Sequence, residues 1–232
     1  MDGALIDVSV AVGFAWRDLD ACRRHNDYLL EAAVRSDGRI VPLCTLPLAH
    51  DAATIATEAR RCIDGGARGF GELRPENLDA DLEDPELAAA LSTAAADERL
   101  LLFHVSEPVG HVYPGKEGFG VGAFYRFVKA RPELRIVGAH WGGGLPFYAL
   151  MPEVQAALDR VWFDTAATSL LYSPDIYTRV RDLVGAGRIL FGSDYPLLSQ
   201  ARSRRRIEES GLDATEIAAV LGGNARALLN LE

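Results

Sequence analysis

The sequence predicts an α/β fold of the TIM type, a (β/α) barrel, and three observations support this prediction. Short apolar runs alternate with longer helical patterns from one end of the 232 residues to the other. The runs are almost continuously hydrophobic, which is typical of strands in a parallel sheet whose faces are both covered by helices. Polar side chains recur at the ends of these runs, where a barrel would gather them around one pocket and an open sheet would spread them out.

Seven apolar runs are the predicted strands, and they span residues 4–14, 40–48, 69–75, 100–106, 135–143, 161–167 and 188–196. The helices between them are predicted from capping residues where they begin and from glycines where they end. These residues are Asp51 with Gly65 and Gly66, Asp84, Ser173, and the capping-box pair Asp213 and Glu216. A single domain over residues 1–232 is expected.

The charge of the chain excludes two classes of partner. The formal net charge is −9, whereas nucleic acids and anionic membranes bind clustered positive charge. One basic run stands out, formed by Arg202, Arg204, Arg205 and Arg206. It is predicted to be a solvated helix face whose counter-charges are Glu208 and Glu209, rather than an anion site.

The cysteines and the hydropathy pattern indicate the compartment. Cys22, Cys44 and Cys62 form neither a C-x-x-C pair nor an even set, so reduced thiols in a cytoplasmic protein are expected. The apolar N-terminus lacks a basic leader, and a strand explains it better than a signal peptide. No stretch is long enough and free enough of charge to span a bilayer.

Residues 110–116 match the first seven places of a phosphate-binding loop, G-x-x-x-x-G-K. The eighth place should carry the Ser or Thr that holds magnesium, but it is Glu117, a negative group where the phosphates would lie. Pro114 also lacks an N–H to donate. Nucleotide binding is therefore not expected.

The polar residues at the strand ends suggest metal chemistry. His104, His140 and Asp194 each follow an apolar run, and Glu72 and Asp164 lie near the ends of theirs. Imidazole and carboxylate suit zinc or a similar divalent ion, which lowers the pKa of bound water towards about 7. His140 could then hydrogen-bond a polarised substrate oxygen, and Asp194 could ligate the metal and move a proton.

Each of these residues also has a structural alternative. A lone histidine at a strand end is often a hydrogen-bonded structural residue, and Asp194 before Tyr-Pro could cap a turn. Glu72 could be a metal ligand, a base behind a ligand or a substrate-binding group. A salt bridge to Arg74 or Arg68 is an equal alternative for it.

The segments HVSEPVGHVYPGK, AHWGGGLPFY, FDTAA and FGSDYP resemble the amidohydrolase-related branch of the amidohydrolase superfamily, which also contains aminocarboxymuconate-semialdehyde decarboxylase-like enzymes. The resemblance covers nearly the whole chain. It implies that His104 and Asp194 are metal ligands and that His140 is a ligand or a catalytic electrophile. It also implies that the seven runs are family strands two to eight.

The sequence departs from the family at one motif. Members begin with a strand bearing an H-x-H pair that holds the metal, and none of the five histidines forms such a pair here. The domain is therefore expected to be N-terminally incomplete. It is also expected to bind divalent metal, most readily zinc, weakly or not at all. The missing pair leaves two protein ligands where catalytic zinc sites usually have three.

Three functions remain open. The first is a metal-dependent hydrolase that acts on a small amide, lactone or ester through metal-activated water. The second is a non-oxidative decarboxylase of a small carboxylic acid on the same fold, and the third is a non-catalytic homologue or truncated, inactive form without H-x-H. The expected partner is a small molecule, and association of the chain with copies of itself is left open.

The loop after the run 100–106 is expected to carry substrate-binding groups. Glu107, His111, Tyr113 and Lys116 would lie over the pocket, as loops do at this end of a barrel. Gly110, Pro114 and Gly115 would shape the loop. The equal alternative is that the polar groups only tie the loop together internally.

Overall fold

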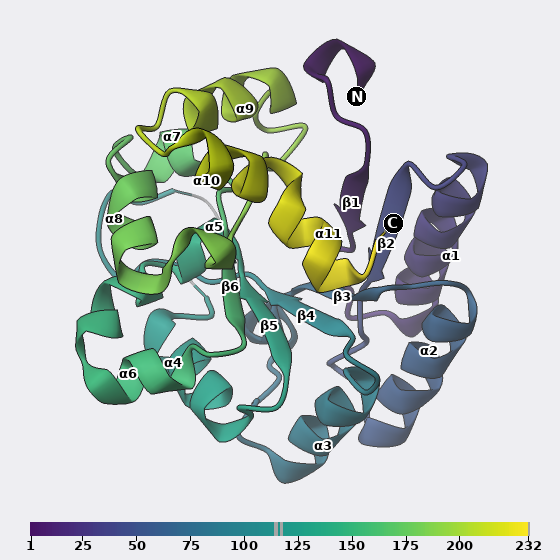
Figure 1. Ribbon diagram of the computed structural model, residues 1–232. Helices are drawn as coiled ribbons and strands as arrows, with labels where there is room; N and C mark the ends of the chain where they lie inside the picture. The colour runs from purple at the N-terminus through teal and green to yellow at the C-terminus, as the bar shows by residue number, and fades with distance from the viewer. Residues whose placement is uncertain (114–115, 117, 232) are drawn as a thin grey trace. The chain divides into compact units, whose positions relative to one another are not determined.

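The structure is a computed structural model that describes residues 1–113, 116 and 118–231 (Figure 1). The chain forms two compact units. The first, called the N-terminal unit, consists of Asp7–His104 and Leu134–Ile136. The second, called the C-terminal unit, consists of Met1–Ile6, Val105–Glu133 and Val137–Glu232. The expectation of a single, N-terminally incomplete domain stays a prediction.

The N-terminal unit alternates strands with helices. Its elements are β1 (Ser9–Val12), α1 (Leu19–Arg35), β2 (Ile40–Cys44), α2 (Ala52–Asp64), β3 (Gly69–Leu73), η2 (Pro75–Leu78), α3 (Pro85–Ala94) and β4 (Leu100–Phe103). The four strands are parallel and pair in chain order, with Ser9 opposite Ile40, Leu43 opposite Gly69, and Gly69 opposite Leu100. Helices α1 and α2 contact each other, and α1 also packs on β2.

The C-terminal unit continues the alternation with shorter helices. It contains α4 (Val121–Ala130), α5 (Ala139–Gly142), η3 (Leu145–Leu150), α6 (Pro152–Ala157), β6 (Val161–Asp164), α7 (Thr168–Leu171), α8 (Ile176–Val184), η4 (Ala186–Arg188), β7 (Ile189–Leu190), α9 (Gln200–Glu208), α10 (Ala214–Ala218), η5 (Ala219–Gly223) and α11 (Asn224–Leu229), and η1 (Asp2–Ala4) belongs to it as well. Strand β5 (Arg135–Gly138) begins in the N-terminal unit and ends in the C-terminal one.

The strand order confirms the predicted α/β class. Among the described residues, seven strands follow one another in the order β1 to β7, and each lies inside one of the seven predicted runs. The run 188–196 contributes only Ile189–Leu190, because the next N–H, that of Phe191, donates to the carbonyl of Val220 instead. The run 135–143 contributes a strand only as far as Gly138, and its remainder forms a tight turn.

The predicted helix ends are confirmed with one shift. Asp51 and Asp84 accept hydrogen bonds from the first turns of α2 and α3, and Asp213 and Glu216 form the expected capping box. Helix α2 ends at Asp64 with Gly65 as its C-cap, as predicted. The helix expected to open at Ser173 begins three residues later, because the chain first makes a turn in which the N–H of Ile176 donates to the Ser173 carbonyl.

The expectations about charge and thiols are confirmed in part, for the helix, the Glu208 counter-charge and the free cysteines. The arginine run lies on α9, where Arg204 pairs with Glu208 at 3.0 Å. The three cysteines are free and fully buried. Burial, with Glu58 nearby, raises the pKa of the Cys22 thiol to about 12. In the described part of the chain, no helix has the length and apolar character needed to cross a membrane.

A buried polar cluster joins α1, α2 and the chain after β2. The Asn26 side chain donates to Glu58 at 2.8 Å and accepts from the backbone N–H of Thr45 at 2.9 Å. Burial raises the pKa of Glu58, but the bonds from Arg61 and Asn26 outweigh it and hold the pKa below its usual value. The cluster therefore fixes the helices that cover β2, a role that the sequence pattern did not predict.

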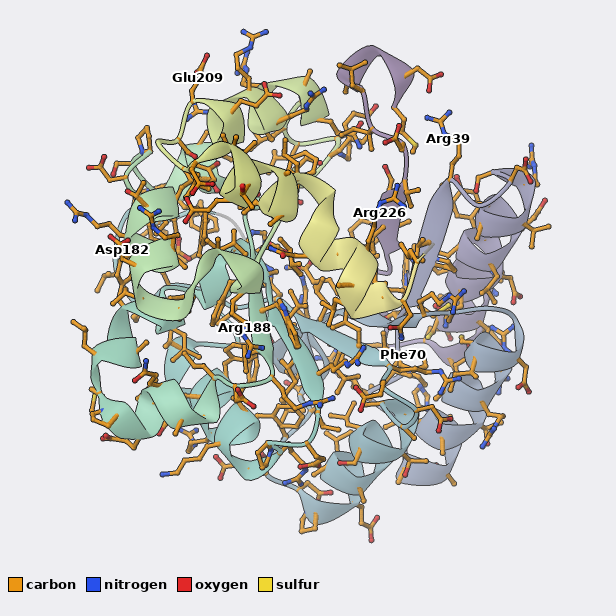
Figure 2. All side chains as sticks on the ribbon, viewed as in Figure 1. Arg39, Phe70, Asp182, Arg188, Glu209 and Arg226 are labelled. Carbon is orange, nitrogen blue, oxygen red and sulfur yellow. The ribbon has the colours of Figure 1, made fainter. Side chains whose placement is uncertain are left out.

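Side chains divide as the hydropathy pattern requires. Phe70 on β3 is fully buried, whereas Asp182 on α8 points outward into solvent (Figure 2). In the C-terminal unit the largest buried side chains include Trp141, Phe124, Phe163 and Tyr177. Trp141 of this core belongs to the turn that follows β5, and Phe163 belongs to β6.

Candidate functional site

In the N-terminal unit, two predicted site residues meet at the carboxyl ends of neighbouring strands. Glu72 is the penultimate residue of β3, and His104 directly follows β4. The strands pair in parallel, and the His104 N–H donates to the Leu73 carbonyl, so both side chains lie at the same end of the sheet. His104 Nδ1 is 2.8 Å from Glu72 Oε1, and the two side chains are only 7% and 15% exposed.

Arg74 completes this group. Its Nη2 atom is 3.2 Å from Glu72 Oε2 and 3.0 Å from His104 Nδ1. Nδ1 cannot accept from Arg74 and donate to Glu72 at once, and the bond to the carboxylate is shorter and joins a donor to a negative acceptor. We therefore assign the proton to Nδ1, which leaves the lone pair on Nε2, the usual arrangement when a carboxylate orients a metal-ligating histidine.

Both sequence-based alternatives for Glu72 are visible in this geometry. The salt bridge to Arg74 is present, with Arg74 Nη2 3.2 Å from Glu72 Oε2. The same carboxylate also lies behind His104. The sequence placed Glu72 and His104 at strand ends, but it did not predict that one carboxylate would bridge the histidine and the arginine.

In the C-terminal unit, His140 begins an unusual turn after β5. His140 and Trp141 have φ values of 55° and 58°, in the left-handed region that non-glycine residues rarely adopt. Such conformations cost about 1–3 kcal/mol each and are found at functional sites. The His140 backbone N–H donates to Asp164 Oδ1 at 2.9 Å, and His140 Nδ1 lies 3.4 Å from the Ala166 carbonyl oxygen.

Asp194 lies four residues beyond the end of β7, so it does not follow the strand as closely as the apolar run suggested. It is exposed, has a φ of 58°, and its carbonyl accepts from the Leu197 N–H. In the described part of the chain it joins no cluster of potential metal ligands. Its role as a ligand and proton carrier stays a prediction.

The loop after β4 is tied together by its own polar groups. The Tyr113 hydroxyl donates to Glu107 Oε2 at 3.0 Å, and Lys116 Nζ donates to the His111 carbonyl at 2.7 Å. Lys116 also lies 5.6 Å from the centre of the Tyr113 ring. These contacts support the internal alternative, and substrate contact by the four residues stays a prediction. Pro114, Gly115 and Glu117 lie outside the described residues.

Tyr172 is a candidate that sequence reasoning missed. Burial, with Glu107 and Tyr113 nearby, raises the pKa of Tyr172 well above its usual value. A Cβ atom built on Gly144 would lie 3.5 Å from the Tyr172 hydroxyl, so this phenol borders the turn that His140 begins. Tyr172 follows a short helix rather than an apolar run, and no strand-end signal marks it in the sequence.

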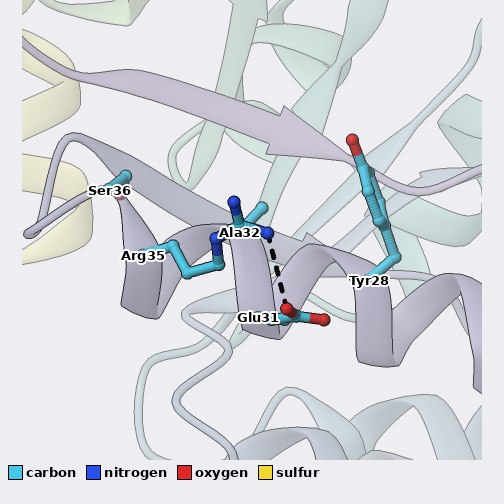
Figure 3. Close-up of a pocket in the computed structure, with 5 residues that line it drawn as sticks. All are labelled: Tyr28, Glu31, Ala32, Arg35 and Ser36. Carbon is cyan, nitrogen blue, oxygen red and sulfur yellow. Dashed lines mark ion pairs between the residues drawn. The ribbon is translucent and has the colours of Figure 1, made fainter.

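A surface hollow of about 340 Å³ lies elsewhere, on α1 (Figure 3). It is lined by Tyr28, Glu31, Ala32, Arg35 and Ser36, and its Arg35–Glu31 pair is 3.5 Å apart. All five residues come from one helix and its end, and none is a predicted site residue. The hollow therefore has no part in the candidate site.

Comparison with solved structures shows the fold. A 2,6-dihydroxybenzoate decarboxylase from Rhizobium has a TM-score of 0.82 and 18% identity, covering 100% of this chain and 86% of its own. A 5-carboxyvanillate decarboxylase from Sphingomonas paucimobilis has a TM-score of 0.77 and 17% identity, covering 100% and 81%. A dihydroxybenzoic acid decarboxylase from Polaromonas, with bound manganese and the inhibitor 2-nitroresorcinol, has a TM-score of 0.77 and 18% identity, covering 98% and 80%. The TIM-type α/β prediction is thereby confirmed.

Family membership follows from the sequence match. A model of the amidohydrolase family matches residues 2–231, which is nearly the whole chain. The match agrees with the resemblance carried by the segments around His104, His140 and Asp194. The chain therefore belongs to the amidohydrolase family.

Proposed function

We propose that this protein is a metal-dependent decarboxylase that removes CO₂, without oxidation, from a small aromatic carboxylic acid. The observation that carries the proposal is the bond between Glu72 and His104 at adjacent strand ends, on a fold shared with three decarboxylases. The same likeness favours the decarboxylase alternative over the hydrolase that the sequence suggested first.

The donor chemistry fits a divalent metal. His104 would bind through Nε2 while Glu72 holds its ring, and Asp194 would add a carboxylate oxygen. Mixed oxygen and imidazole donors suit manganese as well as zinc, and a manganese ion is present in the decarboxylase from Polaromonas.

When bound, the metal would supply positive charge that polarises a substrate oxygen. The protein's own residues would do the rest. Decarboxylation breaks one carbon–carbon bond, releases CO₂ and puts one proton on the carbon that carried it. We propose that His140 delivers this proton, and that Asp194 returns one to His140 from solvent, to which it is exposed.

The loop residues would then determine which acid is bound. Lys116 is the cation of the loop, and Tyr113 and Tyr172 offer phenol groups beside Glu107. A cation and hydroxyl donors suit the carboxylate and ring hydroxyls of a hydroxybenzoate. The substrate class proposed here is therefore a hydroxylated aromatic acid.

The test is a substrate screen with added metal. Purified protein is incubated with excess Mn²⁺ or Zn²⁺ and a panel of hydroxybenzoates, and separately with amides, lactones and esters. We expect CO₂ release only from the acids, with activity at least 100-fold lower in His140→Ala and His104→Ala. His50→Ala is the matched control, because the His50 ring lies 3.0 Å from the Arg17 carbonyl oxygen and is not a predicted site residue. Turnover of an ester or amide without CO₂ would overturn the proposal in favour of a hydrolase.

A further inference from the structure

The turn after β5 is left-handed over five consecutive residues. His140, Trp141, Gly142, Gly143 and Gly144 all have positive φ values, between 55° and 92°. The three glycines adopt this conformation at no steric cost, but His140 and Trp141 do not. A run of this kind persists only when surrounding groups determine it.

The packing explains why glycines follow Trp141. A Cβ atom on Gly142 would lie 2.7 Å from the Phe163 ring, and one on Gly143 would lie 2.7 Å from the Ser106 carbonyl oxygen. The turn is thus pressed against β6 and against the chain after β4.

The second residue of the turn is anchored by its side chain. Trp141 is fully buried, and its Nε1–H donates to Thr168 Oγ1 at 2.8 Å. Thr168 in turn donates to the Thr165 carbonyl at 2.6 Å. The Trp141 ring also packs edge-on against Tyr177, with ring centres 5.3 Å apart.

The first residue of the turn, His140, is anchored through its backbone. Asp164 is the last residue of β6 and is buried. Its Oδ1 atom accepts from the His140 N–H at 2.9 Å and from the Ala166 N–H at 3.0 Å. One oxygen therefore joins the turn after β5 to the chain after β6.

We infer that Asp164 is a positioning residue that aims the His140 imidazole by holding its backbone in the left-handed conformation. The His140 and Ala166 groups that donate to Oδ1 are backbone N–H groups, from which a carboxylate or an amide oxygen can accept. The inference rests on the proposed function only for what the imidazole does once it is aimed. The hydrogen bond itself and the backbone conformation belong to the structure.

The experiment compares Asp164→Ala, which removes the acceptor, with Asp164→Asn, which keeps it and removes the charge. Asp182→Ala is the control, since this exposed aspartate pairs with Arg181 on the outside of α8 (Figure 2). Protein labelled with ¹⁵N-histidine gives amide and ring signals for five histidines, and those of His140 are identified by their loss in His140→Gln.

We expect Asp164→Ala to shift or broaden the His140 signals while the other four histidines keep theirs. In the decarboxylase assay this variant should lose about 100-fold in kcat, the effect of a misplacement of about 1 Å, with KM changed less than threefold. Asp164→Asn should keep the His140 signals and at least a tenth of the wild-type kcat, and Asp182→Ala should change neither.

Unchanged His140 signals in folded Asp164→Ala would overturn the inference. If Asp164→Ala does not fold, Asp164→Asn alone tests the inference. A loss of kcat in Asp164→Asn as large as the loss in His140→Gln would overturn it, because it would mean that the charge of Asp164 matters and its hold on the backbone does not. Wild-type protein that shows the expected signals but decarboxylates nothing would refute the proposed function and leave the positioning role standing.

Discussion

Removing the Glu72 carboxylate is the perturbation that tests the candidate metal site in most detail. In Glu72→Ala, the His104 Nδ1–H loses an acceptor at 2.8 Å and Arg74 loses its ion pair at 3.2 Å. The His104 side chain is only 7% exposed, so water cannot fully replace the carboxylate. Removing such a buried partner costs about 1–3 kcal/mol.

Part of this cost should appear in metal binding, because the ring of His104 is no longer held for Nε2 to bind. Loss of a carboxylate behind a ligating histidine lowers metal affinity about 10- to 100-fold. We expect this fall in Mn²⁺ affinity by isothermal titration calorimetry for Glu72→Ala. Glu72→Gln should fall less, since its amide oxygen still accepts from Nδ1.

Glu31→Ala is the matched control for this measurement. It removes a carboxylate that also pairs with an arginine, Arg35, but on the surface of α1 (Figure 3). Its Mn²⁺ affinity should equal that of the wild type. If Glu72→Ala binds Mn²⁺ as tightly as the wild type does, the assigned tautomer and the role of Glu72 are both wrong.

Two further predictions concern stability. Gly143→Ala should lower the free energy of unfolding by about 1–3 kcal/mol, because its Cβ would meet the Ser106 carbonyl oxygen at 2.7 Å. Gly66→Ala, also at positive φ but with open space around it, should lower that free energy less in a urea titration. Equal losses of unfolding free energy in the two variants would contradict the packing argument. Burial raises the Cys22 pKa from 9.0 to about 12, so the unfolded thiol ionises first and stability should fall as pH rises through this window. Between pH 8 and 11, the melting temperature of Cys22→Ala should fall less than that of the wild type. An equal fall in both proteins would show that this thiol does not contribute to the pH dependence of stability.

The strands and most helix ends were predictable because their signals are local. A run of apolar residues predicts a buried strand wherever it lies, and Asp51 or Asp213 caps a helix through bonds within the first turn. The turn 140–144 was not predictable from such signals. Its first residues continue an apolar run, and its conformation depends on Asp164 and Phe163, which lie about twenty residues further along the chain.

The candidate site was predictable only in part for the same reason. His104 and Glu72 stand at strand ends, and parallel pairing of β3 with β4 brings them together. The sequence could not show that Arg74 would share the Glu72 carboxylate, because Arg68 also lies close to Glu72 along the chain and was an equal candidate for the salt bridge. Tyr172 gave no signal, since its environment comes from burial and from Glu107 and Tyr113 on a distant loop.

The measurement that tests the central claim most directly is the fate of the substrate's carboxylate in deuterated water. Protein with excess Mn²⁺ is incubated in D₂O with 2,6-dihydroxybenzoate, the acid named for the Rhizobium enzyme of the same fold. A decarboxylase should release one CO₂ per product molecule and leave one deuterium on the carbon that lost it, read by mass spectrometry and NMR. Hydrolysis of an ester, amide or lactone by the same metal-loaded protein, with no CO₂ and no carbon-bound deuterium from any hydroxybenzoate, would contradict the account.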